Sequence, residues 1–214
     1  MSYILLTNVS KTIQKKVILD NINLSLEKNR IYGFVGRNGS GKTMLFRAIC
    51  GLIQCDGTIC VDGKIIGEDI SSPHNLGLII ENVGLWPDLT GMQALTLLAG
   101  LNKKIDKKGV SKSITRVGLD PEDKRPYQKY SLGMKQRLVI AQAIMEKPDL
   151  LILDEPTNAL DESGVKLLRD IVVEEKERGA TVLVASHNSD DIGLLCDDVF
   201  HLQNGCLVFN KSNQ

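Results

Sequence analysis

The sequence predicts an α/β protein with a mainly parallel sheet, an antiparallel β layer and an inserted helical region. The parallel sheet is indicated by apolar segments separated by helical stretches, a pattern typical of strands that are covered on both faces. The antiparallel layer is indicated by alternating residues in the first third of the chain. The helical region is indicated by a long interval in which strand signals vanish.

Each layer can be assigned to segments of the chain. The parallel strands are predicted where short runs are apolar throughout, at 31–35, 76–80, 150–153 and 181–185. The antiparallel layer is predicted from the alternation at 22–26 and from a hairpin, whose turn signal Asp62-Gly63 joins 58–61 to 64–66. Helical periodicity dominates around 91–101, 109–117 and 132–146.

We expect one domain that spans residues 1–214. Its core comprises 1–80 and 148–214, and 81–147 forms a helical subdomain inserted into it. A length of 214 residues fits this organisation.

Composition excludes several classes of protein. The 26 Lys and Arg residues balance 26 Asp and Glu residues, so no basic surface for nucleic acid is expected and no nucleic-acid motif is found. No apolar run approaches the roughly 18–20 residues of a transmembrane helix, and MSYILLTNVSKT lacks the features of a signal peptide. The five cysteines fit no zinc spacing and indicate reduced thiols. We therefore expect a cytoplasmic protein that contacts a membrane only through a partner.

A phosphate-binding loop follows the first apolar strand. GRNGSGKT lies between the strand IYGFV and a helix beginning MLFRAIC, which is the context that GxxxxGK[ST] requires. Its backbone N–H groups can surround a β-phosphate, Lys42 can reach the β and γ oxygens, and the Thr43 hydroxyl can bind Mg²⁺. The sequence thus predicts a P-loop NTPase core that binds a nucleoside triphosphate through Gly36, Arg37, Asn38, Gly39, Ser40, Gly41, Lys42, Thr43 and Met44.

Two acidic residues follow another buried strand, in LLILDEP. Asp154 is placed to hold Mg²⁺, directly or through water. Glu155 is either a surface carboxylate at the end of the strand or a general base that positions water against the γ-phosphate. The second interpretation predicts hydrolysis rather than phosphoryl transfer to an acceptor.

Two further features lie near candidate phosphate sites. His187 follows the apolar segment VLVAS, at the strand edge where open α/β sheets bind ligands, and could contact the γ-phosphate. In YSLGMKQRL, Ser131 caps a predicted helix whose N-terminus would be a second anion site. The sequence alone leaves open which phosphate that second site would serve.

These motifs together resemble the ATP-binding-cassette (ABC) ATPases. GRNGSGKT resembles the Walker A loop, LLILDEP the Walker B strand, and YSLGMKQR the signature sequence. Asn158-Ala-Leu-Asp161 resembles the D-loop, and Ser186-His187 the switch histidine. The order and spacing also match the family, and the resemblance extends over nearly the whole chain.

The resemblance implies an ATP- and Mg²⁺-dependent ATPase with Lys42, Glu155 and His187 as its catalytic residues. It implies separately encoded transmembrane subunits and a second ABC ATPase subunit, identical or different, bound head to tail. Ser131 and Gly133 would then contact the nucleotide held by that second subunit. The protein would lie at the inner face of the cell membrane.

Some positions depart from the common family pattern. Ile13 stands where an aromatic ring usually stacks on adenine, which leaves an aliphatic contact with the base. Leu132 and Met134 replace the usual glycine and glutamine of the signature. Glu81 replaces a glutamine that senses Mg²⁺ and water, and its carboxylate is predicted to be a Mg²⁺ ligand. A glutamate at this position is similar to that of bacterial exporters of the lantibiotic and bacitracin type. Trp86 follows as a hinge residue or as an anchor for a partner helix.

Other interpretations remain open. The chain could be the ATPase subunit of a soluble assembly, such as an iron–sulfur scaffold. A protein that only binds nucleotide is disfavoured because Glu155 and His187 are both present. The basic run at 102–108 is expected to be a solvated loop rather than a contact with anionic lipid.

Overall fold

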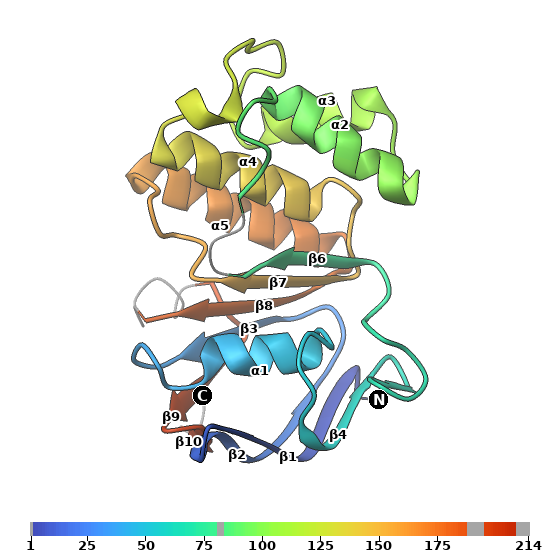
Figure 1. Ribbon diagram of the computed structural model, residues 1–214, viewed down its shortest axis with the longest axis vertical. Coiled ribbons are helices and arrows are strands. Elements are labelled where there is room, and N and C mark those ends of the chain that lie inside the picture. Colours follow the sequence, from blue (N-terminus) through green and yellow to red (C-terminus); the bar gives the residue numbers. More distant parts are fainter. Residues whose placement is uncertain (1, 81–83, 188–194, 209–214) are drawn as a thin grey trace.

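The computed structural model describes residues 2–80, 84–187 and 195–208. Its secondary structure is arranged in layers (Figure 1). A six-stranded sheet runs across the middle, helices lie above it, and one helix separates it from a four-stranded antiparallel sheet below. The α/β fold predicted from the sequence is confirmed.

The six-stranded sheet has the order β10-β9-β3-β8-β7-β6. Its parallel strands are β3 (Ile31–Val35), β6 (Leu76–Ile79), β7 (Leu150–Asp154), β8 (Thr181–Ser186) and β9 (Asp198–Gln203). β10 (Cys206–Val208) pairs antiparallel to β9 at the edge. Every residue of β3, β7 and β8 is buried, which explains why these strands are apolar except at their ends, where β7 has Asp154 and β8 has Thr181 and Ser186.

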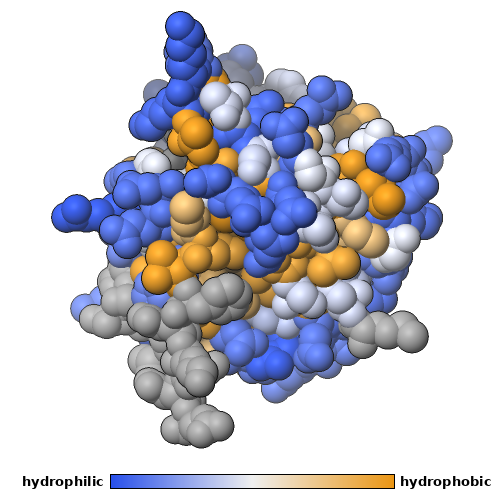
Figure 2. Space-filling view, turned by 90° about the horizontal axis from the view of Figure 1, so that it is seen from below, coloured by the Kyte–Doolittle hydropathy of each residue, from blue (hydrophilic) through white to orange (hydrophobic). Residues whose placement is uncertain are grey.

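The antiparallel sheet has the order β2-β1-β4-β5. It consists of β1 (Ile4–Ile13), β2 (Lys16–Leu26), β4 (Asp56–Val61) and β5 (Lys64–Ile65). The predicted hairpin is confirmed, because Asp62 and Gly63 both adopt positive φ, as a tight two-residue turn requires. These strands leave Leu5 and Val17 exposed, and apolar side chains on this side of the molecule are surrounded by hydrophilic ones (Figure 2).

Two hydrophobic cores lie on opposite faces of the six-stranded sheet. The lower core joins the sheet to α1 (Lys42–Ile49) and to the antiparallel layer, and contains the edge-to-face pair Phe34 and Phe46. The upper core contains Val35 and Leu153, packed under the upper helices. Since neighbouring residues of a strand point to opposite faces, β3 contributes to both cores.

The upper helices are α2 (Gly91–Asn102), α3 (Lys107–Arg116), η1 (Tyr127–Lys129), α4 (Leu132–Ile144) and α5 (Glu162–Glu177). Side-chain caps fix several of their starts. Asp106 accepts a hydrogen bond from the Gly109 N–H, so α3 begins at residue 107 and not at 109 as predicted. None of the helices in the described ranges is long and apolar enough to cross a membrane.

Sequence patterns missed several elements and misplaced some ends. β1, β9, β10, η1 and α5 were not predicted as separate elements, and the strand predicted at 22–26 is the end of the longer β2. The predicted helix at 132–146 ends at residue 144 and the predicted strand at 64–66 ends at residue 65. The bulges in the β1–β2 pairing break the alternation on which strand prediction depends.

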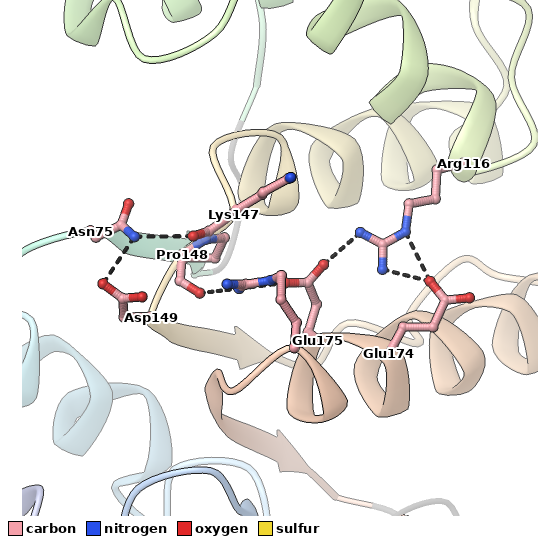
Figure 3. Close-up of polar contacts among 8 residues, drawn as sticks. Asn75, Arg116, Lys147, Pro148, Asp149, Glu174 and Glu175 are labelled. Atoms are coloured by element: carbon pink, nitrogen blue, oxygen red, sulfur yellow. Dashed lines mark hydrogen bonds and ion pairs between the residues drawn. The ribbon is translucent and has the colours of Figure 1, made fainter.

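A buried carboxylate connects α3 to α5 (Figure 3). Glu175 of α5 is 1% exposed and accepts hydrogen bonds from Arg116 of α3, at 2.5 Å, and from Arg178, at 2.7 Å. Arg116 also contacts the more exposed Glu174, and Arg178 donates to the carbonyl of Pro148. The network therefore joins α3 both to α5 and to the segment that enters β7.

Candidate functional site

The strands that precede the predicted site residues end at the same edge of the sheet. Val35 of β3 pairs with Ser186 of β8, and Asp154 of β7 pairs with Ala185. Because the strands are parallel and in this register, their carboxyl ends are level and the following loops meet. Residues that are far apart in the sequence are thereby brought into one cleft.

The loop after β3 needs glycine at positions where backbone approaches backbone. A Cβ on Gly36 would lie 2.4 Å from the carbonyl oxygen of Leu202 and 2.5 Å from Ser40 Oγ. Gly41 has φ of 112° and precedes the first residue of α1. The loop is held by a hydrogen bond from the Gly205 N–H to the carbonyl of Ser40, at 2.9 Å. Its backbone therefore opens onto the cleft with little side-chain cover.

Lysine, threonine and two acids meet beneath this loop. Thr43 Oγ1 donates a hydrogen bond to Asp154 Oδ2 at 2.5 Å. Lys42 Nζ donates to the carbonyl of Gly36 at 2.7 Å and lies 3.5 Å from Glu155 Oε1. Asp154 and Lys42 are 3% and 5% exposed. The cluster thus combines an ammonium group with hydroxyl and carboxylate oxygens, which are the ligand types that suit Mg²⁺.

Glu155 lies between Lys42 and His187. The Glu155 carboxylate is 2.8 Å from His187 Nδ1 on one side, and Lys42 lies on its other side. Its backbone has φ of 49°, an uncommon left-handed conformation that costs on the order of 1–3 kcal/mol. A hydrogen bond from its N–H to the carbonyl of Ala185 holds this conformation. Glu155, which follows β7, and His187, which follows β8, thus point into the same cleft.

The cleft has a volume of about 420 Å³. Sequence motifs anticipated most of its lining, but Lys16, Ile18 and Arg47 also line it and no motif indicated them. Ile13 is not part of the lining; it lies at the end of β1, 41% exposed. Across the β1–β2 turn it pairs with Lys16, which does reach the cleft. The sequence could not show whether Ile13 or Lys16 approaches the site, because this depends on how β1 pairs with β2.

The Ser40 hydroxyl provides a test of whether the cleft suits phosphate. It is buried and has no hydrogen-bond partner within the described ranges. A buried hydroxyl without a partner is unfavourable, and a phosphate oxygen would satisfy it. The residues present therefore fit a nucleotide phosphate with its divalent cation.

The segment containing Ser131 and Gly133 lies apart from this cleft. Ser131 caps α4 by accepting a hydrogen bond from the Met134 N–H at 3.2 Å, and Leu132 is 71% exposed. Neither Ser131 nor Gly133 lines the cleft of its own chain. The N-terminal turn of α4 therefore presents its capped end to the surface.

The start of α4 is joined to the loop that follows β7. Gln136 donates to the carbonyl of Pro156 at 2.9 Å, and Arg137 donates to Asp161 at 3.2 Å. The Gly164 N–H, Ser163 and Arg137 lower the pKa of the Asp161 carboxyl. Two side-chain hydrogen bonds thus connect α4 to this loop. Glu81, predicted as a metal ligand, lies outside the described residues.

Comparisons with known proteins identify the family to which the chain belongs. The family model described as "ABC transporter" matches residues 19–158. A Bacillus subtilis ABC transporter ATP-binding protein, YybJ, is 49% identical, over 94% of this chain and 92% of its own length. The bacitracin transport ATP-binding protein BcrA of Enterococcus faecalis is 39% identical, over 97% of this chain and 69% of its own length.

A further relative and a solved structure belong to the same class of protein. The lantibiotic transport ATP-binding protein SrtF of Streptococcus pyogenes is 34% identical, over 95% of this chain and 88% of its own length. Among solved structures, the CbiO1 subunit of a Clostridium perfringens ABC transporter complex has a TM-score of 0.81 and 27% identity, over 97% of this chain and 87% of its own.

The chain belongs to the ABC transporter family. The resemblance and the P-loop α/β fold predicted from the sequence are therefore confirmed. The protein is an ABC ATPase, an ATP-binding subunit of a transporter.

Proposed function

We propose that the protein is the ATP-hydrolysing subunit of a membrane exporter and that it works as a head-to-tail dimer. The observation that carries this proposal is the convergence of Lys42, Thr43, Asp154, Glu155 and His187 at one cleft. Such a combination supplies phosphate binding, metal binding and activation of water together. The similarity to bacitracin and lantibiotic transport proteins supports export.

ATP binds with its phosphates in the loop of residues 36–43. Lys42 exchanges its hydrogen bond with the Gly36 carbonyl for the β and γ oxygens, and the Ser40 hydroxyl gains a partner. Thr43 and Asp154 supply oxygen ligands for Mg²⁺. A Mg²⁺ ion held by these residues would supply positive charge that offsets the negative charge of the phosphates during transfer.

Glu155 and His187 act on the attacking water. The Glu155 carboxylate accepts a hydrogen bond from water and aligns it with the γ-phosphate. His187, which is within 2.8 Å of that carboxylate, orients it and contacts the γ oxygens. Products are ADP and phosphate, with the proton of the water transferred to Glu155 and then to solvent.

The second subunit completes the site. Ser131 and Gly133 lie away from their own chain's cleft, so the N-terminus of α4 is free to face a nucleotide bound by the partner. A helix N-terminus favours the negative γ-phosphate, and hydrolysis removes that anion from between the two subunits. Nucleotide turnover would in this way open and close the dimer.

Transmembrane subunits attach through a groove beside α2. Trp86 is 44% exposed and lines, with Leu85, Pro87 and Leu98, a hollow of about 350 Å³. Aromatic and apolar anchors of this kind suit a helix from a partner. We place the protein in the cytoplasm, at the inner face of the membrane, with residues 81–147 forming the helical subdomain of one nucleotide-binding domain.

The decisive experiment replaces Glu155 by Gln. The variant should bind ATP and Mg²⁺, lose at least about a hundredfold in turnover, in line with general-base catalysis, and accumulate as an ATP-dependent dimer in size-exclusion chromatography. Glu162→Gln is a matched control, because Glu162 is an exposed carboxylate in the first turn of α5. Wild-type turnover in Glu155→Gln would refute the role of this residue.

A further inference from the structure

The far end of the helical layer exposes leucine side chains on α2. This helix contains no charged residue, and Leu97 and Leu101 are 50% and 75% exposed. Because they are four residues apart, both lie on the same face of the helix, one turn apart. Leu98, next to them, lines the Trp86 groove. The apolar face therefore continues from the groove toward the end of the helix.

Lysines follow this face directly. Lys103 follows the last residue of α2 and has φ of 54°, which ends the helix, and Lys107 and Lys108 open α3. All three side chains are exposed and make no ion pair within the described part of the chain. Lys104 differs, because it donates to Asn75 at 2.8 Å and is directed toward the protein. Figure 1 shows α2 and α3 together at the end of the molecule opposite the antiparallel sheet.

The acidic residues near this surface already have other partners, since Glu146 contacts Asn102 and Lys104. Residues 102–112 contain five lysines and a single acid, Asp106. The Asp106 carboxylate already caps α3 through the Gly109 N–H. Lys107 and Lys108 also lie at the positive end of the α3 dipole, where a bound anion would relieve repulsion.

We propose that Leu97, Leu101, Lys103, Lys107 and Lys108 form a basic tip that rests on the anionic headgroups of a lipid bilayer. Lysines near such a surface are attracted by its negative potential, and leucines gain by entering the boundary between headgroups and acyl chains. Protein interfaces are instead depleted in lysine and enriched in aromatic residues and arginine. The Trp86 groove has the composition of a protein-docking site, whereas the basic tip has that of a lipid contact.

This contact adds a second attachment to the one made through transmembrane subunits. The lipid contact requires neither ATP hydrolysis nor the transmembrane subunits, so it can be tested with the purified protein alone. It replaces the expectation that the protein reaches the membrane only through a partner, because the sequence could not show that Leu97 and Leu101 remain uncovered beside the lysines.

The test is sedimentation of the full-length protein with vesicles of phosphatidylcholine alone or mixed with phosphatidylglycerol. We expect binding only to the mixed vesicles, and binding that weakens as salt is raised. Replacing the tip lysines should lower the partition coefficient by about fivefold each, or on the order of a hundredfold together. The variant is Lys103→Gln/Lys107→Gln/Lys108→Gln. Leu97→Ser/Leu101→Ser should lower it by at least about tenfold.

A matched control removes the same charge elsewhere, in Lys15→Gln/Lys64→Gln/Lys166→Gln, since these lysines are exposed and lie outside the α2–α3 region. It should bind mixed vesicles like the wild type. All variants should keep their ATPase rate in solution, so a failure of this proposal is separable from a failure of the ATPase assignment. Equal loss in the control would overturn the proposal. The proposal would also be overturned if the wild type did not bind mixed vesicles. In that case, loss of co-purification with the transmembrane subunits in the tip variants would show that the tip contacts those subunits and not lipid.

Discussion

The buried Glu175 carboxylate gives the sharpest prediction about stability. It is 1% exposed and lies between Arg116 and Arg178. Removing one partner of a fully buried ion pair costs about 3–5 kcal/mol, because the remaining charge is left without compensation. Here the arginine side chains are 32% and 29% exposed, so water can partly replace the carboxylate. We therefore expect Glu175→Gln to destabilise the protein by about 2–3 kcal/mol.

The assay is thermal unfolding without nucleotide, since bound ligand would shift the midpoint. For a chain of this size, the expected loss lowers Tm by roughly 5–10 °C. Glu174→Gln is the matched control, because Glu174 is 58% exposed and contacts the same Arg116; an exposed pair contributes about 0–1 kcal/mol. If both variants unfold at the same temperature, burial of Glu175 adds nothing and the reasoning is wrong.

Three further predictions concern the cleft and the core. Thr43→Val should raise the Mg²⁺ concentration needed for ATPase activity at least tenfold, because it removes the hydroxyl that reaches Asp154. Thr43→Ser retains the hydroxyl and should require the same Mg²⁺ concentration as the wild type. A titration of ATPase activity with Mg²⁺ distinguishes the two variants. Gly36→Ala should abolish measurable ATP binding, because its Cβ would meet the Leu202 carbonyl. Gly39→Ala, which meets nothing within 4 Å, should cost only about 1–2 kcal/mol of stability. Burial raises the pKa of the Cys50 thiol from 9.0 to about 12, so its contribution to stability is complete below pH 9 and falls as pH rises toward 12. Urea unfolding across that range should show a shallower decline in Cys50→Ala, and equal slopes would contradict the assignment.

The fold could be predicted where burial is uniform along a segment. β3, β7 and β8 are covered on both faces, so nearly all of their residues are apolar, and the polar ones, Thr181, Asp154 and Ser186, lie at strand ends. β1 is different: it is partly exposed, and bulges interrupt its pairing with β2, so no regular period marks it. α5 begins at its Asp161 cap, a residue that the sequence first suggested as part of the D-loop. Because Asp161 was assigned to the D-loop motif, its role as the cap that begins α5 was not predicted.

The site could be predicted where motifs lie in short continuous segments. The predicted residues lie at the ends of core strands or in the segments that follow them, and the sheet register then brings together Lys42, Thr43, Asp154, Glu155 and His187. Lys16 and Ile18 line the same cleft but come from the antiparallel layer, whose approach to α1 is a property of tertiary packing. Ile13 was predicted from its place in the family pattern, and in the structure its partner across the β1–β2 turn, Lys16, lines the cleft. A family pattern does not show how the two sides of a turn are placed around a ligand.

In the proposed dimer, Ser131 would contact the partner's nucleotide, so turnover can be coupled between the two subunits through α4. Gln136 and Arg137 tie the start of α4 to the loop that carries Pro156 and Asp161, and this loop begins at the strained Glu155. A nucleotide bound by the partner would attract the N-terminus of α4. Because α4 is bonded to this loop, the attraction would also shift the backbone that positions the Glu155 carboxylate of the same chain as α4. Removing both bonds with Gln136→Met/Arg137→Met should leave ATP binding intact and reduce the cooperativity of hydrolysis with respect to ATP. Unchanged cooperativity, with intact dimer formation, would show that the two sites communicate by another route.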